Sequence, residues 1–259
     1  MNSFKIGGFD SSTTFLVVED IQVEPLTPKQ STLSLKERDG IIDFSFSNQY
    51  NRLIFDERVI TMKCVYRYNS INDMYNKINS IYGAIYNNVK GELELSTTPG
   101  VKWNACLLNI QKQEITGNST GRMVIQYRVE PFSHSEQEII VNQNLSGSAS
   151  LTVNNPGTAT SNKHLISLTN IKGNTGGIFI QKPDGTFIEC SKIFNDGDNL
   201  VIDFTNFEIL VNGDPVENLE WDGDFFELPS GNMPIEIDFS GTATMKWYLV
   251  PQYFYSKNS

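Results

Sequence analysis

The sequence predicts a mostly β protein, with an α+β N-terminal domain that holds one helix and an all-β C-terminal sandwich. Apolar residues recur at every second position through most of the chain, which is the period of a half-buried strand. One segment, residues 70–87, has the three- and four-residue spacing of an amphipathic helix instead. After residue 137 only strands and tight turns are indicated, at the spacing typical of a sandwich.

In the first strands, period-two patterns cover residues 15–25, 31–38 and 41–46. Asp39-Gly40 has the composition of a two-residue type I′ turn between the second and third of these strands. Such a turn predicts an in-register hairpin in which apolar residues meet apolar ones and opposite charges meet. The predicted pairs are Leu35 with Phe44, Leu33 with Phe46, and Lys36 with Asp43.

The helix over residues 70–87 is expected to cover one face of a sheet. Ser70 is a favourable N-cap, and Asp73 suits the positive end of the helix dipole. The apolar positions predicted to face the sheet are Ile71, Met74, Tyr75, Ile78, Tyr82 and Ile85. Further strands are indicated at residues 57–68, 91–96, 101–111 and 122–132. The long strands at 57–68 and 122–132 are candidates for continuing a sheet into a neighbouring protomer.

The stretch 133–162 is rich in Ser, Asn, Gly and Thr, and we interpret it as the junction between domains, with two short strand candidates inside it. The predicted domains are therefore residues 1–137 and 138–259. In the second domain, Asn212-Gly213 predicts a hairpin turn that places Ile209 opposite Val216. A Pro-Asp-Gly turn is indicated within residues 177–190.

The composition excludes several classes of function. The chain has 259 residues with 20 basic and 30 acidic side chains, a net charge of −10, which disfavours binding to the outside of nucleic acid or to anionic membranes. Its three cysteines lack a CxxC spacing, so neither a disulfide framework nor a zinc site is predicted. No secretory signal and no 18-residue apolar run is present, and we expect folding in a reducing cytoplasm.

Candidate chemistry is sparse, so no catalytic, cofactor-binding or metal-ligating residues are predicted. The two histidines, His134 and His164, lie in or beside the polar junction and are interpreted as exposed loop residues. Residues 195–199 and 221–226 resemble pieces of calcium loops but lack the full ligand order, which favours turns. Trp103 and Trp247 are expected in the core. Trp221 is the candidate for stacking on a sugar.

Several stretches together resemble the distal tail protein (Dit) family of long-tailed, non-contractile bacteriophages. In LKERDGIIDFSFSNQYNRLIFDERVITMKCVY (35–66), Arg38, Asp39 and Gly40 match the family's turn, and Arg58 and Ile60 match its later strand. Lys36-Glu37 departs from the Pro-Gly that often precedes that turn. The helix is similar in its place along the chain, and so are four further stretches, TTPGVKWNACLL (97–108), LTVNNPGTATSNKHLISLTNIKG (151–173), DNLVIDFTNFEILVNGDPV (198–216) and FFELPSGNMPIEI (225–237).

The resemblance implies a structural virion protein, assembled in the host cytoplasm and placed at the tail tip. It implies a homo-hexameric ring formed by the N-terminal domain, with a galectin-like C-terminal sandwich facing outward. The implied partners are the major tail tube protein, the tail-associated lysin or fibre protein, and receptor-binding or baseplate proteins. DNA would only pass through the ring lumen. The resemblance brings no catalytic residues and no cofactor.

Two other functions compete with the structural hub. A carbohydrate-binding module using the C-terminal sandwich is the first alternative. A galectin-type sugar site is not indicated, because no arginine follows Arg128. A cell-wall hydrolase is the second alternative, disfavoured by the missing His and Cys constellations. The sequence therefore predicts a structural protein and no enzyme.

Overall fold

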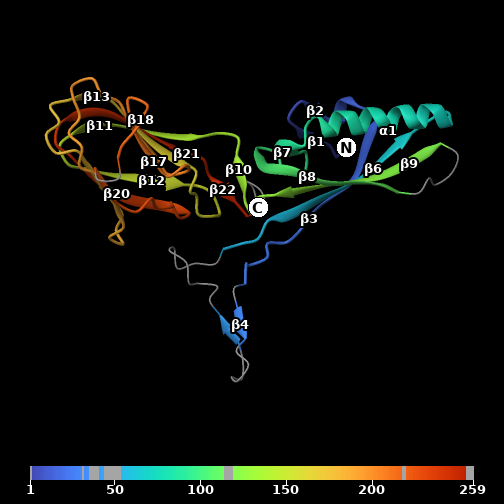
Figure 1. Ribbon diagram of the computed structural model, residues 1–259, viewed down its shortest axis with the longest axis horizontal. Coiled ribbons are helices and arrows are strands. Elements are labelled where there is room, and N and C mark those ends of the chain that lie inside the picture. The colour runs from blue at the N-terminus through green and yellow to red at the C-terminus, as the bar shows by residue number, and fades with distance from the viewer. Residues whose placement is uncertain are drawn as a thin grey trace. The chain divides into compact units, whose positions relative to one another are not determined.

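The computed structural model describes residues 2–30, 32–34, 41–43, 54–113, 119–217 and 220–254, and for 32–34, 41–43 and 112–113 only the main chain. The chain divides into two compact units (Figure 1). Unit 1 runs up to Ser133 and takes in Phe254, and unit 2 is His134–Tyr253. The described residues form many strands, a single α-helix and one 3-10 turn, η1 (Ser11–Thr13), which confirms the mostly β prediction.

Unit 1 is built on one antiparallel sheet with a helix beside it. The strand order is β2 (Phe9–Asp10), β1 (Phe4–Ile6), β7 (Lys90–Leu95), β8 (Val101–Gln113), β9 (Thr120–Val129), β6 (Arg58–Arg67) and β3 (Leu16–Val23). Burial alternates strictly along β6, where Ile60, Met62 and Cys64 are buried and Lys63 between them is exposed. One face of this sheet therefore holds the core of unit 1, and the other remains open.

Helix α1 (Ile71–Tyr86) begins where the sequence predicts, alongside the sheet of unit 1 (Figure 1). The Ser70 hydroxyl accepts a hydrogen bond from the Asp73 amide at 3.1 Å, which satisfies an amide that the helix leaves unpaired. The buried side chains are Met74, Ile78, Ile81 and Ile85. Ile71 and Tyr75, predicted to face the sheet, are instead 68% and 53% exposed, because the buried stripe is turned toward Ile81.

Strands β4 (Thr32–Ser34) and β5 (Ile41–Asp43) form a separate two-stranded sheet whose register differs from the predicted one. Leu33 pairs with Ile42 and not with Phe46, and Asp43 pairs with Thr32 and not with Lys36. The predicted turn at Asp39-Gly40 lies outside the described residues.

The error has a simple cause. The observed register is four residues out of step, and an even shift leaves every side chain on its original face, so alternation cannot detect it. Leu35, Lys36, Phe44 and Phe46 themselves lie outside the described residues.

Unit 2 is a two-layer sandwich. One sheet has the order β11 (Ile139–Ser146), β21 (Thr242–Leu249), β13 (His164–Lys172), β16 (Leu200–Asp203), β17 (Glu208–Val211) and β18 (Asp214–Pro215). The other has the order β12 (Ala149–Asn155), β20 (Gly231–Phe239), β14 (Ile178–Gln181), β15 (Phe187–Cys190) and β19 (Trp221–Gly223). Short strands β10 (Ser133–Ser135) and β22 (Gln252–Tyr253) complete the described elements.

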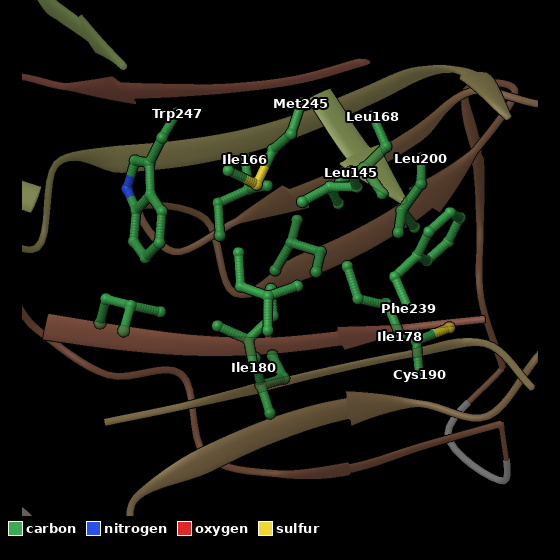
Figure 2. Packing of buried hydrophobic residues seen from close by; sticks show 14 of the residues in the cluster. Leu145, Ile166, Leu168, Ile178, Ile180, Cys190, Leu200, Phe239, Met245 and Trp247 are labelled. Carbon is green, nitrogen blue, oxygen red and sulfur yellow. The ribbon is translucent and has the colours of Figure 1, made fainter. Parts of the chain in front are cut away.

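The two sheets of unit 2 enclose a single apolar core. Figure 2 shows Ile166, Met245 and Trp247 from one layer facing Ile180 and Phe239 from the other. Each of these five residues is 0% exposed to solvent, so the layer between the sheets is dry and close-packed. Burial of this size is the main stabilising contribution to such a sandwich.

The polar stretch interpreted as a junction is part of the sandwich. Strand β11 pairs with β21 over all eight of its residues, and β12 pairs with β20 over all seven. Leu145, Leu151 and Val153 are buried in these strands, while the Ser, Asn and Thr residues between them point mostly to solvent. The polar composition therefore reflects the outer faces of two strands and not a linker.

The Asn212-Gly213 hairpin is confirmed. Leu210 pairs with Pro215, and the Val216 amide donates to the Ile209 carbonyl at 2.8 Å. Asn212 and Gly213 have φ angles of 55° and 89°, as a type I′ turn requires at its two central positions.

Candidate interaction surfaces

The open face of the unit 1 sheet carries charged side chains in cross-strand pairs. Lys63 on β6 lies 3.3 Å from Asp20 on β3, and Arg128 on β9 lies 3.2 Å from Glu57. Lys102 lies 3.1 Å from both Glu92 and Glu94, and its hydrogen bonds to these two carboxylates raise the pKa of the Lys102 ammonium. Acidic and basic groups thus offset one another across this face.

A hollow of about 600 Å³ lies on the same open face, lined by residues of β7, β8 and β9 and by Glu57 just before β6. Glu57, Glu92, Asn104, Arg128 and Glu130 are among its lining residues. Its lining holds no histidine, so it lacks the usual general base for nucleophilic catalysis. We therefore interpret the hollow as part of the charged surface and not as a catalytic site.

The edge of the unit 1 sheet lies elsewhere than the sequence suggested. Strands β6 and β9, covering the two long segments predicted to continue the sheet, each have a neighbour on both sides within the chain. Strands β2 and β3 stand at the two ends of the strand order, and among the described residues the outer side of β3 shows only one bridge, from Val18 to Asn2. The prediction was wrong because the sequence pattern identifies strands without giving their spatial order.

Arg58, which carries the family resemblance on β6, is a buried structural residue. Its side chain donates to the carbonyl oxygens of Glu24 at 2.7 Å, Pro131 at 3.1 Å and Phe254 at 2.8 Å. The residue is 1% exposed, so these bonds lie in a low-dielectric setting where each is strong. Three segments that are distant in the sequence are joined by one guanidinium group, within unit 1.

Both histidines are buried, contrary to the prediction of exposed loop residues. His164 is 2% exposed and stacks on Phe204 with ring centroids 4.1 Å apart, while Trp247 lies 5.7 Å away. Its Nε2 lies 2.9 Å from the Phe226 carbonyl oxygen, which can only accept, so Nε2 carries the proton. Burial lowers the pKa of His164 to about 3, and the ring is neutral at pH 7.

His134 is 6% exposed within β10, with the Lys163 Nζ 3.5 Å from its Nδ1. The prediction failed for both histidines because their neighbours in sequence are polar, while their surroundings come from other strands.

Two of the three tryptophans lie in the cores, as the sequence predicts, and the third lies at an edge strand. Trp103 and Trp247 are 0% exposed and belong to the cores, which confirms those two predictions. Trp221 on the edge strand β19 is half-buried, packs against the core of unit 2 and meets the Phe225 ring edge-on at 5.4 Å and 64°. An indole face held in this way does not support the carbohydrate-binding hypothesis.

The remaining candidate chemistry is accounted for by turns and by reduced thiols. Asp196 accepts from the Gly173 amide at 2.7 Å, and Asp198 accepts from the Asn195 amide at 2.8 Å, so the calcium-like stretch 195–199 has turn-stabilising carboxylates. Cys64 and Cys190 are buried and Cys106 is half-buried, all as free thiols, and burial raises the pKa of Cys64 to about 12.

The described part of the chain shows neither a metal-binding cluster nor a membrane-spanning helix. No group of three or more His, Cys, Asp or Glu side chains there is arranged to hold a metal ion. Nor does any helix in those ranges have the length and apolar character needed to cross a membrane.

Comparisons with known proteins agree over both units. The family model described as the phage tail protein RIFT-related domain matches residues 8–129, and the siphovirus-type tail component C-terminal domain matches residues 156–249. No curated protein matches the chain.

Among solved structures, the Dit protein of phage SPP1 matches with a TM-score of 0.73 at 12% identity, covering 96% of this chain and 99% of that one. That protein is described as a paradigm of the hub adsorption apparatus of phages that infect Gram-positive bacteria. A chain of the phage p2 baseplate has a lower TM-score of 0.47 at 10% identity, covering 95% and 98%. The two family models, with the fold shared with the SPP1 protein, show that the chain belongs to the siphophage distal tail protein (Dit) family, whose members are structural components of the phage tail.

Proposed function

We propose that this chain forms a hexameric ring at the distal end of a long, non-contractile phage tail. The ring would join the major tail tube protein to the tail-associated lysin or fibre protein. Residues 1–137 would form the ring, and residues 138–259, a galectin-like sandwich, would project outward as a docking hub for receptor-binding or baseplate proteins. The role is structural, and no residue is assigned to catalysis.

The observation that carries the proposal is the open edge of the unit 1 sheet. Edge strand β3 is eight residues long, and within the described residues its outer side meets only the Asn2 bridge at Val18, which leaves length for a further strand. A head-to-tail arrangement of copies uses such an edge at every contact and leaves none open once the ring closes. The likeness of the whole chain to the SPP1 hub protein supports the same assignment.

The charged face of the unit 1 sheet suits a channel for DNA. Three of its cations, Lys63, Lys102 and Arg128, are offset by carboxylates, so a passing phosphate backbone would meet fewer uncompensated cations there. The net charge of −10 acts in the same direction. In this proposal DNA passes through the ring without being bound, and assembly takes place in the host cytoplasm with all three thiols reduced.

Electron microscopy of the purified protein, with light scattering, tests the proposal. Rings with a central hole and a mass near six times the 29.2 kDa of one chain, or twice that for stacked rings, are expected. Pro substitution at Ile21 or Val23, whose amides point away from β6, removes a β3 amide from the edge and is expected to reduce ring formation. The matched change at Ser148, in the turn between β11 and β12, should leave the rings intact. A protein that stays monomeric at high concentration and with its tail tube partner present would contradict the proposal.

A further inference from the structure

Three aromatic side chains form an exposed group at the surface of unit 2. Phe207, in the turn between β16 and β17, is 52% exposed, and its ring lies 5.7 Å from that of half-buried Phe225 at 89°. Trp221 meets the other side of the Phe225 ring at 5.4 Å. We call Phe207, Trp221 and Phe225 the aromatic patch. It brings together two turns that are separated in sequence.

The stability of the fold does not explain Phe207. Its φ angle of 58° lies in the left-handed region, which is unfavourable for a residue with a Cβ and which Gly or Asn would occupy more easily. The turn is fixed without the ring, because Asp203 accepts from the Thr205 and Asn206 amides at 2.8 and 3.1 Å. Half of a large apolar side chain therefore remains in water on a strained backbone. Exposed aromatic anchors of this kind are typical of protein-binding surfaces.

The charge around the patch selects its partner. Each of the three aromatic residues is next in sequence to an exposed carboxylate, namely Glu208, Asp222 and Asp224. Between Lys192 and Lys246 the sequence contains twelve acidic residues and no lysine or arginine.

The basic groups bordering this region are already engaged. Lys192 Nζ lies 3.0 Å from Glu220, and Lys182 Nζ lies 2.9 Å from Asp184 and 5.4 Å from the centre of the Phe226 ring. Along the chain, the patch is therefore apolar at its rings and acidic beside each of them, with no lysine or arginine among the neighbouring residues.

We propose that the aromatic patch docks a cationic protein segment that presents an apolar side chain between lysines or arginines. The apolar side chain packs against Phe207 and Phe225, and the cations pair with Glu208, Asp222 and Asp224 or lie over an exposed ring. A sugar fits less well, because the rings meet edge to face and present no flat platform. The proposal rests on the docking role of residues 138–259 and gives that role a surface and a partner chemistry.

Fluorescence anisotropy with the full chain tests the proposal. The probe is a labelled peptide of alternating lysine and leucine, compared with matched peptides in which glutamate replaces lysine or serine replaces leucine. Only the lysine–leucine peptide is expected to bind well, and its affinity should fall as salt is raised. Phe207→Gly, which suits the backbone and removes the ring, should weaken binding about tenfold. Ile193→Gly, at a comparably exposed apolar residue of unit 2, should leave binding unchanged.

A second pair of variants separates the patch from general acidity. The triple variant Glu208→Gln, Asp222→Asn and Asp224→Asn should bind much more weakly than the control triple Asp214→Asn, Glu217→Gln and Glu236→Gln. Equal loss in both triples, unchanged binding by Phe207→Gly, or no binding by the natural chain would overturn the inference. Displacement of the peptide by glucosamine would assign the patch to a glycan and overturn it too. Rings are scored on the same samples, so rings without peptide binding reject this inference alone, and peptide binding without rings rejects the ring.

Discussion

The two units use their sheets in opposite ways. In unit 1, one sheet buries a single face and leaves the other open, charged and bordered by edge strand β3. In unit 2, two sheets turn their apolar faces toward each other and complete a core between them. The comparison indicates that unit 2 is satisfied as a sandwich by itself, whereas unit 1 retains backbone edge and surface for assembly. Stability and assembly should therefore respond to different residues.

The largest effect is expected from the core of unit 2. Trp247→Ala removes a fully buried indole and should lower the free energy of unfolding by roughly 3–5 kcal/mol. Urea unfolding followed by circular dichroism measures this loss. In a Trp221→Phe background, where Trp103 of unit 1 is the remaining tryptophan, the unfolding midpoint seen by fluorescence should change little. Trp221→Ala, at a half-buried edge position, is the control and should cost much less. A parallel loss in the Trp103 signal would show that the two units unfold together and break the comparison.

The next largest loss of stability is expected when the hydrogen bonds of Arg58 in unit 1 are removed. Arg58→Ala leaves three carbonyl oxygens without their charged donor and should cost about 3 kcal/mol in urea unfolding. Arg58→Lys keeps the charge but loses the fork of donors, so a smaller loss is expected. Limited proteolysis should detect release of the chain around Phe254 in both variants. Arg122→Ala, at an exposed position of β9, serves as the control, and an Arg58→Ala protein as stable as that control would contradict this role.

A smaller effect, about 2 kcal/mol between pH 7 and pH 5, is expected from His164 in unit 2. The native pKa of about 3 lies below the unfolded value near 6.5, so the unfolded state binds more protons between these values. Its contribution is complete above pH 6.5 and is lost as the pH falls toward 3. Urea midpoints across this range measure it. His164→Phe should flatten the slope above pH 5, and an unchanged slope would exclude His164 as its source.

Local chemistry made part of this structure predictable. The Asn212-Gly213 hairpin depends on two residues that accept positive φ, and the start of α1 depends on Ser70 and its neighbours. The burial of His164 was not predictable, because the stacking rings of Phe204 and Trp247 arrive from distant strands. Alternation located β4 and β5 but not their register.

The surfaces were the least predictable part of the chain. Sequence identified Trp221 but gave no sign that Phe225 meets both Trp221 and Phe207, because these contacts depend on segments that the sandwich brings together. The acidic run without lysine or arginine after Lys192 was a signal that was available in sequence. Strand order, which decides that β3 is the open edge, depends on tertiary pairing and leaves no local trace.

The smallest effect on stability is expected on the open face of unit 1. Variants there test most directly whether this face serves assembly and not folding. The Arg128–Glu57 pair has side chains 52% and 61% exposed, so removing it by Arg128→Gln should lower the free energy of unfolding by less than about 1 kcal/mol.

If this face lines a passage for DNA, adding an uncompensated cation there should increase its attraction for DNA. Glu57→Gln leaves Arg128 unpaired and should increase retention of the assembled protein on DNA at low salt, with little change in urea midpoint. Glu236→Gln in unit 2 makes the same charge change outside the face and is the control. Equal DNA retention by both variants would reduce the effect to net charge, and a large stability loss in Glu57→Gln would show that the face serves folding and not assembly.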